Sequence, residues 1–158
     1  MVRSALFNIL SDFVEDSRFL DLFAGTGSVG IEALSRGAKS CVFVDNAPEA
    51  IKLIHKNLEA LGLKNKASVL KLDVFEAIEH LAVENEQFDL IFVGPPYHKR
   101  LAHRTLTKLS RYSLLEREGM IITEIFKKEE LEAEYGNLVL MNQHKYGDNR
   151  LLFYRMTV

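Results

Sequence analysis

The chain has 158 residues, of which 47% are hydrophobic, 27% charged and 9% aromatic, and its formal net charge is −2. A disordered chain would carry fewer apolar residues and a larger net charge, and a disulfide-stabilised scaffold would need several cysteines where this chain has only Cys41. The small net charge gives no sign of a polyanion partner, so any nucleic-acid contact must come from a local basic patch. We therefore expect a single domain over residues 1–158 in a reducing, cytoplasmic compartment.

The apolar runs of the sequence are short, at residues 19–23, 41–44, 69–72, 90–93, 120–125, 138–141 and 151–154. None approaches the roughly 18 residues that span a membrane, so no membrane partner is expected. The first five runs alternate with helical patterns, which predicts a mostly parallel sheet with right-handed crossovers and helices on both faces. Residues 144–150 join the last two runs and are too few for a crossover, so these runs should form an antiparallel hairpin at one edge.

The clearest helix is predicted over residues 47–61, where apolar side chains recur at helical spacing. Asn46 is the expected N-cap, Pro48 lies in the first turn, Glu49 can close a capping box, and Gly62 ends the helix. Ligands of such sheets bind beyond the carboxyl ends of the strands, so the residues after each run are the candidates for function.

A glycine-rich turn with Gly25, Gly27 and Gly30 follows the first run and opens a helix. This spacing is shared by proteins that bind dinucleotides and by those that bind S-adenosylmethionine. Asp21 distinguishes them, because a carboxylate within an apolar strand suits the positive amino group and sulfonium of S-adenosylmethionine and would repel a pyrophosphate. The alternative is that Asp21 only binds backbone N–H groups of the loop.

Two further acids end the second and third runs. Asp45 can accept both hydroxyls of a ribose, although it could equally be a solvated acid near a helix start. Asp73 is followed by Glu76 at capping-box spacing, so helix capping is as good an explanation as adenine recognition for that residue alone. Together with Asp21, the acids fall at successive strand ends, which favours a shared ligand.

The fourth run ends in Gly94-Pro95-Pro96-Tyr97. Two prolines cannot continue a strand, so they turn the chain away from the sheet and leave carbonyl groups and an aromatic ring at its edge. The ring could stack on a flipped base while a proline carbonyl accepts from its exocyclic amine; the alternative is an ordinary turn with a packed tyrosine.

The segment 98–112 is basic, and this pattern is typical either of a solvated helix face or of a phosphate contact. No spacing of histidine and cysteine indicates a metal site, and Cys41 is expected in the core.

The sequence resembles the class I S-adenosylmethionine-dependent methyltransferases, and within them the RsmD-like enzymes that methylate a guanine exocyclic amine in bacterial small-subunit ribosomal RNA. The resemblance is carried by the segment Val2-Arg3-Ser4-Ala5-Leu6-Phe7-Asn8-Ile9-Leu10, by Asp21-Leu22-Phe23-Ala24-Gly25-Thr26-Gly27 continuing through residues 32–38, by the Pro-Pro-Tyr motif, and by Tyr146-Gly147-Asp148 with Leu152-Phe153-Tyr154.

The resemblance implies a Rossmann-like, doubly wound, mostly parallel seven-stranded sheet with an antiparallel C-terminal hairpin. The expected cofactor is S-adenosylmethionine, and the expected partner is ribosomal RNA or an assembling small ribosomal subunit. Candidate cofactor-binding residues are Asp21, Phe23, Ala24, Gly25, Thr26, Gly27, Asp45, Asn46, Asp73 and Val74; candidate catalytic residues are Gly94, Pro95, Pro96 and Tyr97; candidate RNA contacts are Arg3, Lys99, Arg100 and Arg104.

The sequence departs from the family pattern at two places. The basic segment that family members usually carry ahead of Val2–Leu10 is not present, and Gly94 stands where the family has Asp or Asn. An acceptor at that position would orient the amine and raise its nucleophilicity, so Gly94→Asp is expected to raise the rate of methyl transfer. Alternatively, the Pro95 carbonyl, water or Glu124 replaces the missing acceptor. Two other functions stay open: the chain binds the cofactor without catalysis, or it methylates an adenine amine in DNA. A dehydrogenase is less favoured than either.

Overall fold

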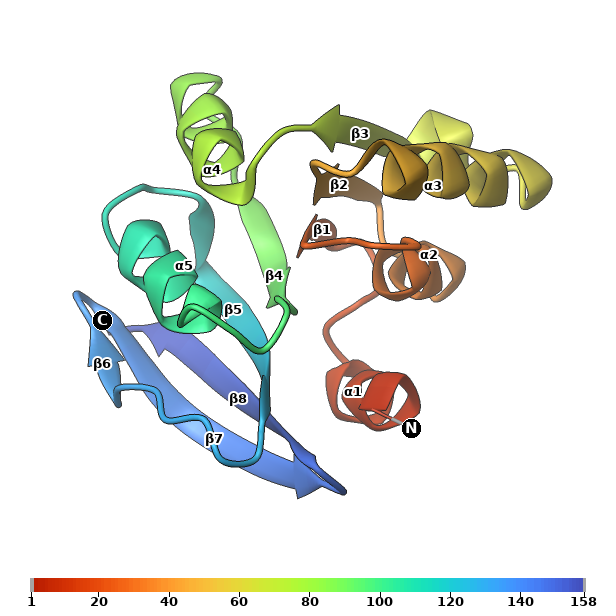
Figure 1. Cartoon of the computed structure of the whole chain (residues 1–158). Helices are drawn as coiled ribbons and strands as arrows, with labels where there is room; N and C mark the ends of the chain where they lie inside the picture. Colours follow the sequence, from red (N-terminus) through yellow and green to blue (C-terminus); the bar gives the residue numbers. More distant parts are fainter. Residues whose placement is uncertain (1, 158) are drawn as a thin grey trace.

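The computed structural model describes residues 2–157, which form an eight-stranded sheet in the order β3-β2-β1-β4-β5-β8-β7-β6 (Figure 1). The strands are β1 (Arg18–Leu22), β2 (Ser40–Asp45), β3 (Ala67–Lys71), β4 (Phe88–Val93), β5 (Leu115–Phe126), β6 (Glu134–Tyr135), β7 (Leu138–Tyr146) and β8 (Asn149–Met156). The first five are parallel to one another, and the last three are added antiparallel beyond β5. The doubly wound, mostly parallel sheet with a C-terminal hairpin is confirmed.

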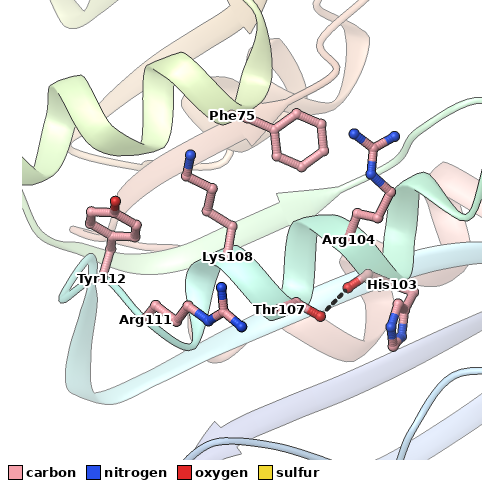
Figure 2. A pocket seen from close by; sticks show the side chains of 7 residues that line it. All are labelled: Phe75, His103, Arg104, Thr107, Lys108, Arg111 and Tyr112. Atoms are coloured by element: carbon pink, nitrogen blue, oxygen red, sulfur yellow. Dashed lines mark hydrogen bonds between the residues drawn. The ribbon is translucent and has the colours of Figure 1, made fainter.

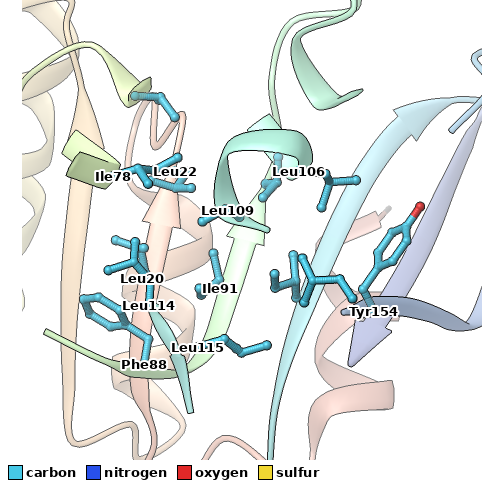
Figure 3. Packing of buried hydrophobic residues seen from close by; sticks show 14 of the residues in the cluster. Leu20, Leu22, Ile78, Phe88, Ile91, Leu106, Leu109, Leu114, Leu115 and Tyr154 are labelled. Atoms are coloured by element: carbon cyan, nitrogen blue, oxygen red, sulfur yellow. The ribbon is translucent and has the colours of Figure 1, made fainter. Parts of the chain in front are cut away.

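Helices cover both faces of the sheet. They are α1 (Val2–Leu10), α2 (Ser28–Ser35), α3 (Pro48–Ala60), α4 (Val74–Val83) and α5 (Leu101–Leu109), with a short 3₁₀ turn at Lys64–Lys66. Alternate residues of each strand point to opposite faces and form two apolar layers. On β4, for example, Ile91 and Val93 pack with α4 and α5, whereas Leu90 and Phe92 pack with α1, α2 and α3. Figure 3 shows the first of these layers.

The sheet has one strand more than the seven expected. The additional strand, β6, has only two residues, which is too short for an apolar pattern to reveal. Tyr135 of β6 is buried; its hydroxyl lies 2.8 Å from Nδ1 of His103 on α5, and its ring packs edge-on against Tyr154 of β8. This strand therefore connects the hairpin to α5 and covers the outer edge of β7.

The helix predicted at residues 47–61 is α3, with a different start. Its N-cap is Ala47 rather than Asn46, so Glu49 falls at the second helical position and the expected capping box does not form. The N–H of Ala47 donates to Asp45 Oδ1 at 3.0 Å, which fixes the chain at the entry to the helix, but no side chain of the described residues caps the first turn. Gly62 follows the helix at φ 68°, as predicted for a C-terminal glycine.

No helix within residues 2–157 is both long and apolar enough to cross a membrane.

Candidate active site

The loop between β1 and α2 has an unusual backbone. Phe23 lies at φ 61° and Gly27 at φ 81°, both in the left-handed region that only glycine adopts without strain. Gly27 precedes α2 and provides no side-chain cap for the first turn of this helix. A Cβ atom at Gly30 would lie 2.4 Å from the Phe43 ring. The third glycine therefore lets α2 pack closely against β2.

Asp21 lies beneath this loop and is only 1% exposed. Its Oδ2 accepts the Gly30 N–H at 3.0 Å, and burial raises the pKa of the carboxyl to about 7, with Asp45 adding to the effect and the Gly30 bond opposing it. This geometry favours the alternative in which Asp21 fixes the loop. Its contact with a positively charged ligand stays a prediction.

Asp45 is half-buried at the end of β2, and both of its carboxylate oxygens accept backbone N–H groups. Oδ2 accepts from Gly25 at 2.9 Å and Oδ1 from Ala47 at 3.0 Å. Each oxygen keeps a second lone pair, so the carboxylate can still accept hydroxyl groups. The two bonds fix its orientation and join the glycine-rich loop to the start of α3.

Asp73 is the N-cap of α4, as the capping alternative predicts. Its Oδ2 accepts the N–H of Phe75 at 2.9 Å. A capping box would instead use the N–H of Glu76, one residue further along. Capping uses one oxygen of the carboxylate, so it does not prevent a second contact.

A small cavity of about 50 Å³ lies where these strand ends meet. It is lined by Phe23, Asp45, Asn46, Leu72, Asp73 and Val74. The structure thus brings together one group of the predicted cofactor residues, while Ala24, Gly25, Thr26 and Gly27 form the loop leading away from β1. Leu72 was not singled out from the sequence, because an apolar residue at the end of an apolar run gives no signal of its own.

The Pro-Pro-Tyr motif leaves the carboxyl end of β4. Pro95 is buried, Pro96 accepts the N–H of His98 at 3.0 Å, and Tyr97 is 52% exposed. The Tyr97 ring packs against Phe126 at the end of β5, with ring centroids 6.0 Å apart. An exposed aromatic face at the end of β4 fits the predicted place for a target base.

Gly94 has no room for a side chain. A Cβ atom there would lie 2.6 Å from Cε2 of Phe92, whose ring is 4% exposed. Gly94→Asp would therefore require a buried ring to move, so the expectation that this substitution alone raises the rate is not supported.

Glu124 lies next to Gly94 in the neighbouring strand. Val93, the last residue of β4, pairs with Thr123 of β5, so Gly94 and Glu124 directly follow a paired position on two neighbouring parallel strands. Asn149 Nδ2 of β8 donates to Glu124 Oε2 at 2.9 Å. Burial raises the pKa of Glu124 against the effect of Asn149, and burial together with the nearby Glu124 raises the pKa of Tyr97. From the sequence Glu124 is only one of several possible substitutes for the missing acceptor, and Asn149 gives no signal, because strand pairing brings the two together from distant segments.

The basic segment forms a groove of about 600 Å³ along α5 and the start of α4 (Figure 2). Its lining residues are Phe75, His103, Arg104, Thr107, Lys108, Arg111 and Tyr112. The Arg104 guanidinium lies 4.8 Å from the Phe75 ring centroid, and Lys108 forms an ion pair with Glu79. Lys99 and Arg100 lie in the loop before α5, whereas Arg3 lies on α1, so the predicted RNA contacts are divided between the two faces of the sheet.

Within residues 2–157 the structure has no group of three or more His, Cys, Asp or Glu side chains placed to bind a metal ion.

A mostly parallel sheet with an antiparallel end, a glycine-rich loop after β1 and acids after β2 and β3 define a Rossmann-like methyltransferase fold. The chain belongs to the RsmD-like methyltransferase family, since residues 1–155 match the family described as "Conserved hypothetical protein 95".

Among curated relatives, YlbH of Bacillus subtilis (strain 168), provisionally named as an rRNA methyltransferase, is 36% identical over 98% of this chain and 84% of its own length. Ribosomal RNA small subunit methyltransferase D of Escherichia coli (strain K12) is 33% identical over 85% of this chain, which spans 63% of that protein.

Solved structures agree. A conserved hypothetical protein of Streptococcus pyogenes superposes with a TM-score of 0.88 at 33% identity, covering 96% of this chain and 93% of the other. The structure named SMU.776, a methyltransferase complexed with S-adenosylhomocysteine (SAH), is only 17% identical and shows the fold alone, with a TM-score of 0.76 over 98% of this chain and 49% of its own.

Proposed function

We propose that this protein transfers a methyl group from S-adenosylmethionine to a guanine exocyclic amine in small-subunit ribosomal RNA. The observation that carries the proposal is the cavity between Phe23, Asp45 and Asp73, which lies on the same edge of the sheet as the Pro-Pro-Tyr motif. The names of the relatives support ribosomal RNA as the substrate, since several are called small subunit methyltransferase D.

The residues at the cavity fit a nucleoside. Phe23 and Leu72 supply apolar walls, and Asp45 offers an oriented carboxylate for ribose hydroxyls. About 50 Å³ holds only a few atoms, so the cavity would take one edge of the adenine ring near Asn46, Asp73 and Val74. The loop from Ala24 to Gly27 would then lie against the remainder of the cofactor. Most of its N–H groups already donate within the protein, as those of Ala24, Gly25 and Gly27 do. A carboxylate of the cofactor would therefore bind at the start of α2, at the N–H groups of Ser28 and Val29.

When bound, S-adenosylmethionine supplies an electrophilic methyl group on a sulfonium centre. The chain's own contribution is to place the amine. The Pro95 carbonyl can accept one N–H of the target amine and the Tyr97 ring can stack on the base, which would hold the amine in line with the methyl group.

The groove along α5 is the proposed contact with the RNA backbone. Arg104 and Lys108 of α5 line it together with Arg111 of the turn that follows, and Phe75 and Tyr112 add aromatic faces (Figure 2). Lys99 and Arg100 extend this basic surface toward Tyr97, which would place phosphates beside the target base. Arg3 would contact a separate part of the RNA.

The proposal is tested by radiolabelled methyl transfer from S-adenosylmethionine to three acceptors: small-subunit ribosomal RNA, assembling small subunits, and duplex DNA. We expect label in the ribosomal acceptor, on guanine, and mass spectrometry of ribosomal RNA from a strain lacking the protein should show the same guanine unmethylated. Label in DNA adenine would support the DNA methyltransferase instead. Cofactor binding without label in any acceptor would support a binding protein, which the missing side chain at position 94 favours.

A further inference from the structure

The end of β4 lacks a polar side chain where the target amine is expected. Gly94 has none, and Phe92 occupies the volume that a Cβ atom at position 94 would enter, at 2.6 Å. The buried Phe92 ring of the preceding strand thus fills the space that a side chain at position 94 would need. An acceptor for the amine must come from a neighbouring element.

Glu124 is the acid nearest in the sheet. Residues Val93 and Thr123 are paired on parallel strands, so the residues that follow them point to the same face of the sheet. Ile122 and Phe92 confirm which face this is, because both belong to the apolar layer beneath α1, α2 and α3. The Glu124 side chain thus leaves the strand next to Gly94, on the face of the sheet to which a side chain at position 94 would point.

The Glu124 carboxylate is oriented and still has a free oxygen. Asn149 Nδ2 donates to Oε2 at 2.9 Å, and within residues 2–157 no side chain or backbone group donates to Oε1. No lysine, arginine or histidine of the described residues forms an ion pair with Glu124. Tyr97 lies close enough for the Glu124 charge to raise the pKa of its phenol. The Glu124 side chain therefore lies near Tyr97 and beside the end of β4.

We propose that Glu124 is the proton acceptor for the target amine and that Asn149 positions it. The inference rests on the proposed function. In the step, the amine nitrogen forms a bond to the methyl carbon, the carbon–sulfur bond breaks with its electron pair staying on sulfur, and one N–H proton passes from the nitrogen to the Glu124 carboxylate.

The decisive variant is Glu124→Gln, which keeps the size of the side chain and can still accept from Asn149 but cannot take the proton. We expect its single-turnover methylation rate to fall about 10²-fold or more, with unchanged affinities for S-adenosylmethionine and RNA. The wild-type rate should rise with pH as Glu124 loses its proton, and the Gln variant should lose this part of the rise. Asp21 on β1, with a pKa of about 7, titrates in both proteins and contributes equally to their pH profiles, so the difference between the two profiles reports on Glu124. Asn149→Ala should lower the rate less and keep the pH dependence, because the carboxylate remains.

Rescue provides a matched control. Placing an acid at position 94 with room for it, by Phe92→Leu and Gly94→Asp in the Glu124→Gln protein, should restore part of the rate, whereas Phe92→Leu alone should not. Equal rates in wild type and Glu124→Gln would overturn the role of Glu124 and leave the proposed function intact. If the wild type itself transfers no methyl group to ribosomal RNA, the proposed function fails, and the role of Glu124 fails with it.

A readout without catalysis tests the placement. Because the Glu124 carboxylate raises the pKa of Tyr97, Glu124→Gln should lower the pKa of one tyrosine in an ultraviolet titration of the free protein. The affected tyrosine should be absent from the titration of Tyr97→Phe. No change in any tyrosine would overturn the proposed arrangement of Glu124 beside Tyr97.

Discussion

The carboxyl ends of β1, β2 and β3 differ from those of β4 and β5 in how their polar groups are held. At the ends of β1, β2 and β3 every acid accepts backbone N–H groups: Asp21 from Gly30, Asp45 from Gly25 and Ala47, and Asp73 from Phe75. At the ends of β4 and β5 the polar groups depend on other side chains, as Glu124 does on Asn149. The acids of the first three strand ends are thus oriented by the backbone, whereas the ends of β4 and β5 depend on contacts between side chains, as the close approach of Phe92 to position 94 also illustrates.

The largest effect is expected from Asp21→Asn. The folded-state pKa of Asp21 is raised to about 7, above its unfolded value of 3.8, so the native state holds a proton that the unfolded state releases between these two values. The wild type should therefore lose stability as the pH rises from about 4 to about 7, by at most about 4 kcal/mol, and the Asn variant should not. Urea unfolding at pH 5 and pH 8 measures the difference.

The matched control is Asp73→Asn, which leaves Asp21 in place and should retain the fall in stability. The same Asp21→Asn protein decides between the two roles of this residue. Unchanged affinity for S-adenosylmethionine at pH 8 would mean that Asp21 only fixes the loop, and weaker binding would mean that its charge meets the cofactor. A pH profile of stability identical to the wild type would contradict the raised pKa.

A smaller effect is expected from Asp45→Ala. Removing a charged acceptor should weaken binding of S-adenosylmethionine by roughly 1.5–3 kcal/mol, measured by calorimetry. The structure adds that Gly25 and Ala47 would lose their acceptor, so the free energy of unfolding should fall as well. Asp45→Asn keeps one acceptor oxygen, so its affinity for S-adenosylmethionine should lie between those of the wild type and Asp45→Ala. Unchanged affinity in both variants would remove Asp45 from the site.

Much of the structure at the carboxyl ends of the strands is predictable from sequence, because each strand is an apolar run followed by acids, glycines or prolines. The runs ending near Asp45 and Val93 gave the parallel strands, and the glycine spacing gave the loop. The capping of Asp73 and the burial of Asp21 were open alternatives, since one sequence pattern fits both a helix cap and a ligand contact. The contact between Glu124 and Asn149 depends on the antiparallel register of β5 and β8, and the collision between Gly94 and Phe92 depends on which face of β4 is filled; local patterns encode neither.

The packing at position 94 gives the next prediction. Gly94→Asp should destabilise the protein by about 1–3 kcal/mol, because its Cβ atom would meet the buried Phe92 ring. Combining it with Phe92→Leu should recover stability relative to the sum of the two single changes. Thermal unfolding of the four proteins in this cycle measures the coupling. Additive effects would mean that the ring moves freely and that the space beside Gly94 is open.

The smallest effect is expected in the groove along α5, where two cations differ in their partners. Arg104 stacks on Phe75 and is exposed, whereas Lys108 is already paired with Glu79. Neutralising Arg104 to Gln should reduce the slope of RNA affinity against salt concentration by about 0.7–0.9 log unit, the value for one phosphate contact. Lys108→Gln is the matched control on the same helix and should reduce the slope less, because its charge is partly compensated by Glu79.

Filter binding to small-subunit ribosomal RNA over a range of salt concentrations gives both slopes. Equal and unaltered slopes in the two variants would make the groove a solvated helix face, and the RNA would then have to be held by the loop with Lys99 and Arg100 or by Arg3 on the opposite face of the sheet.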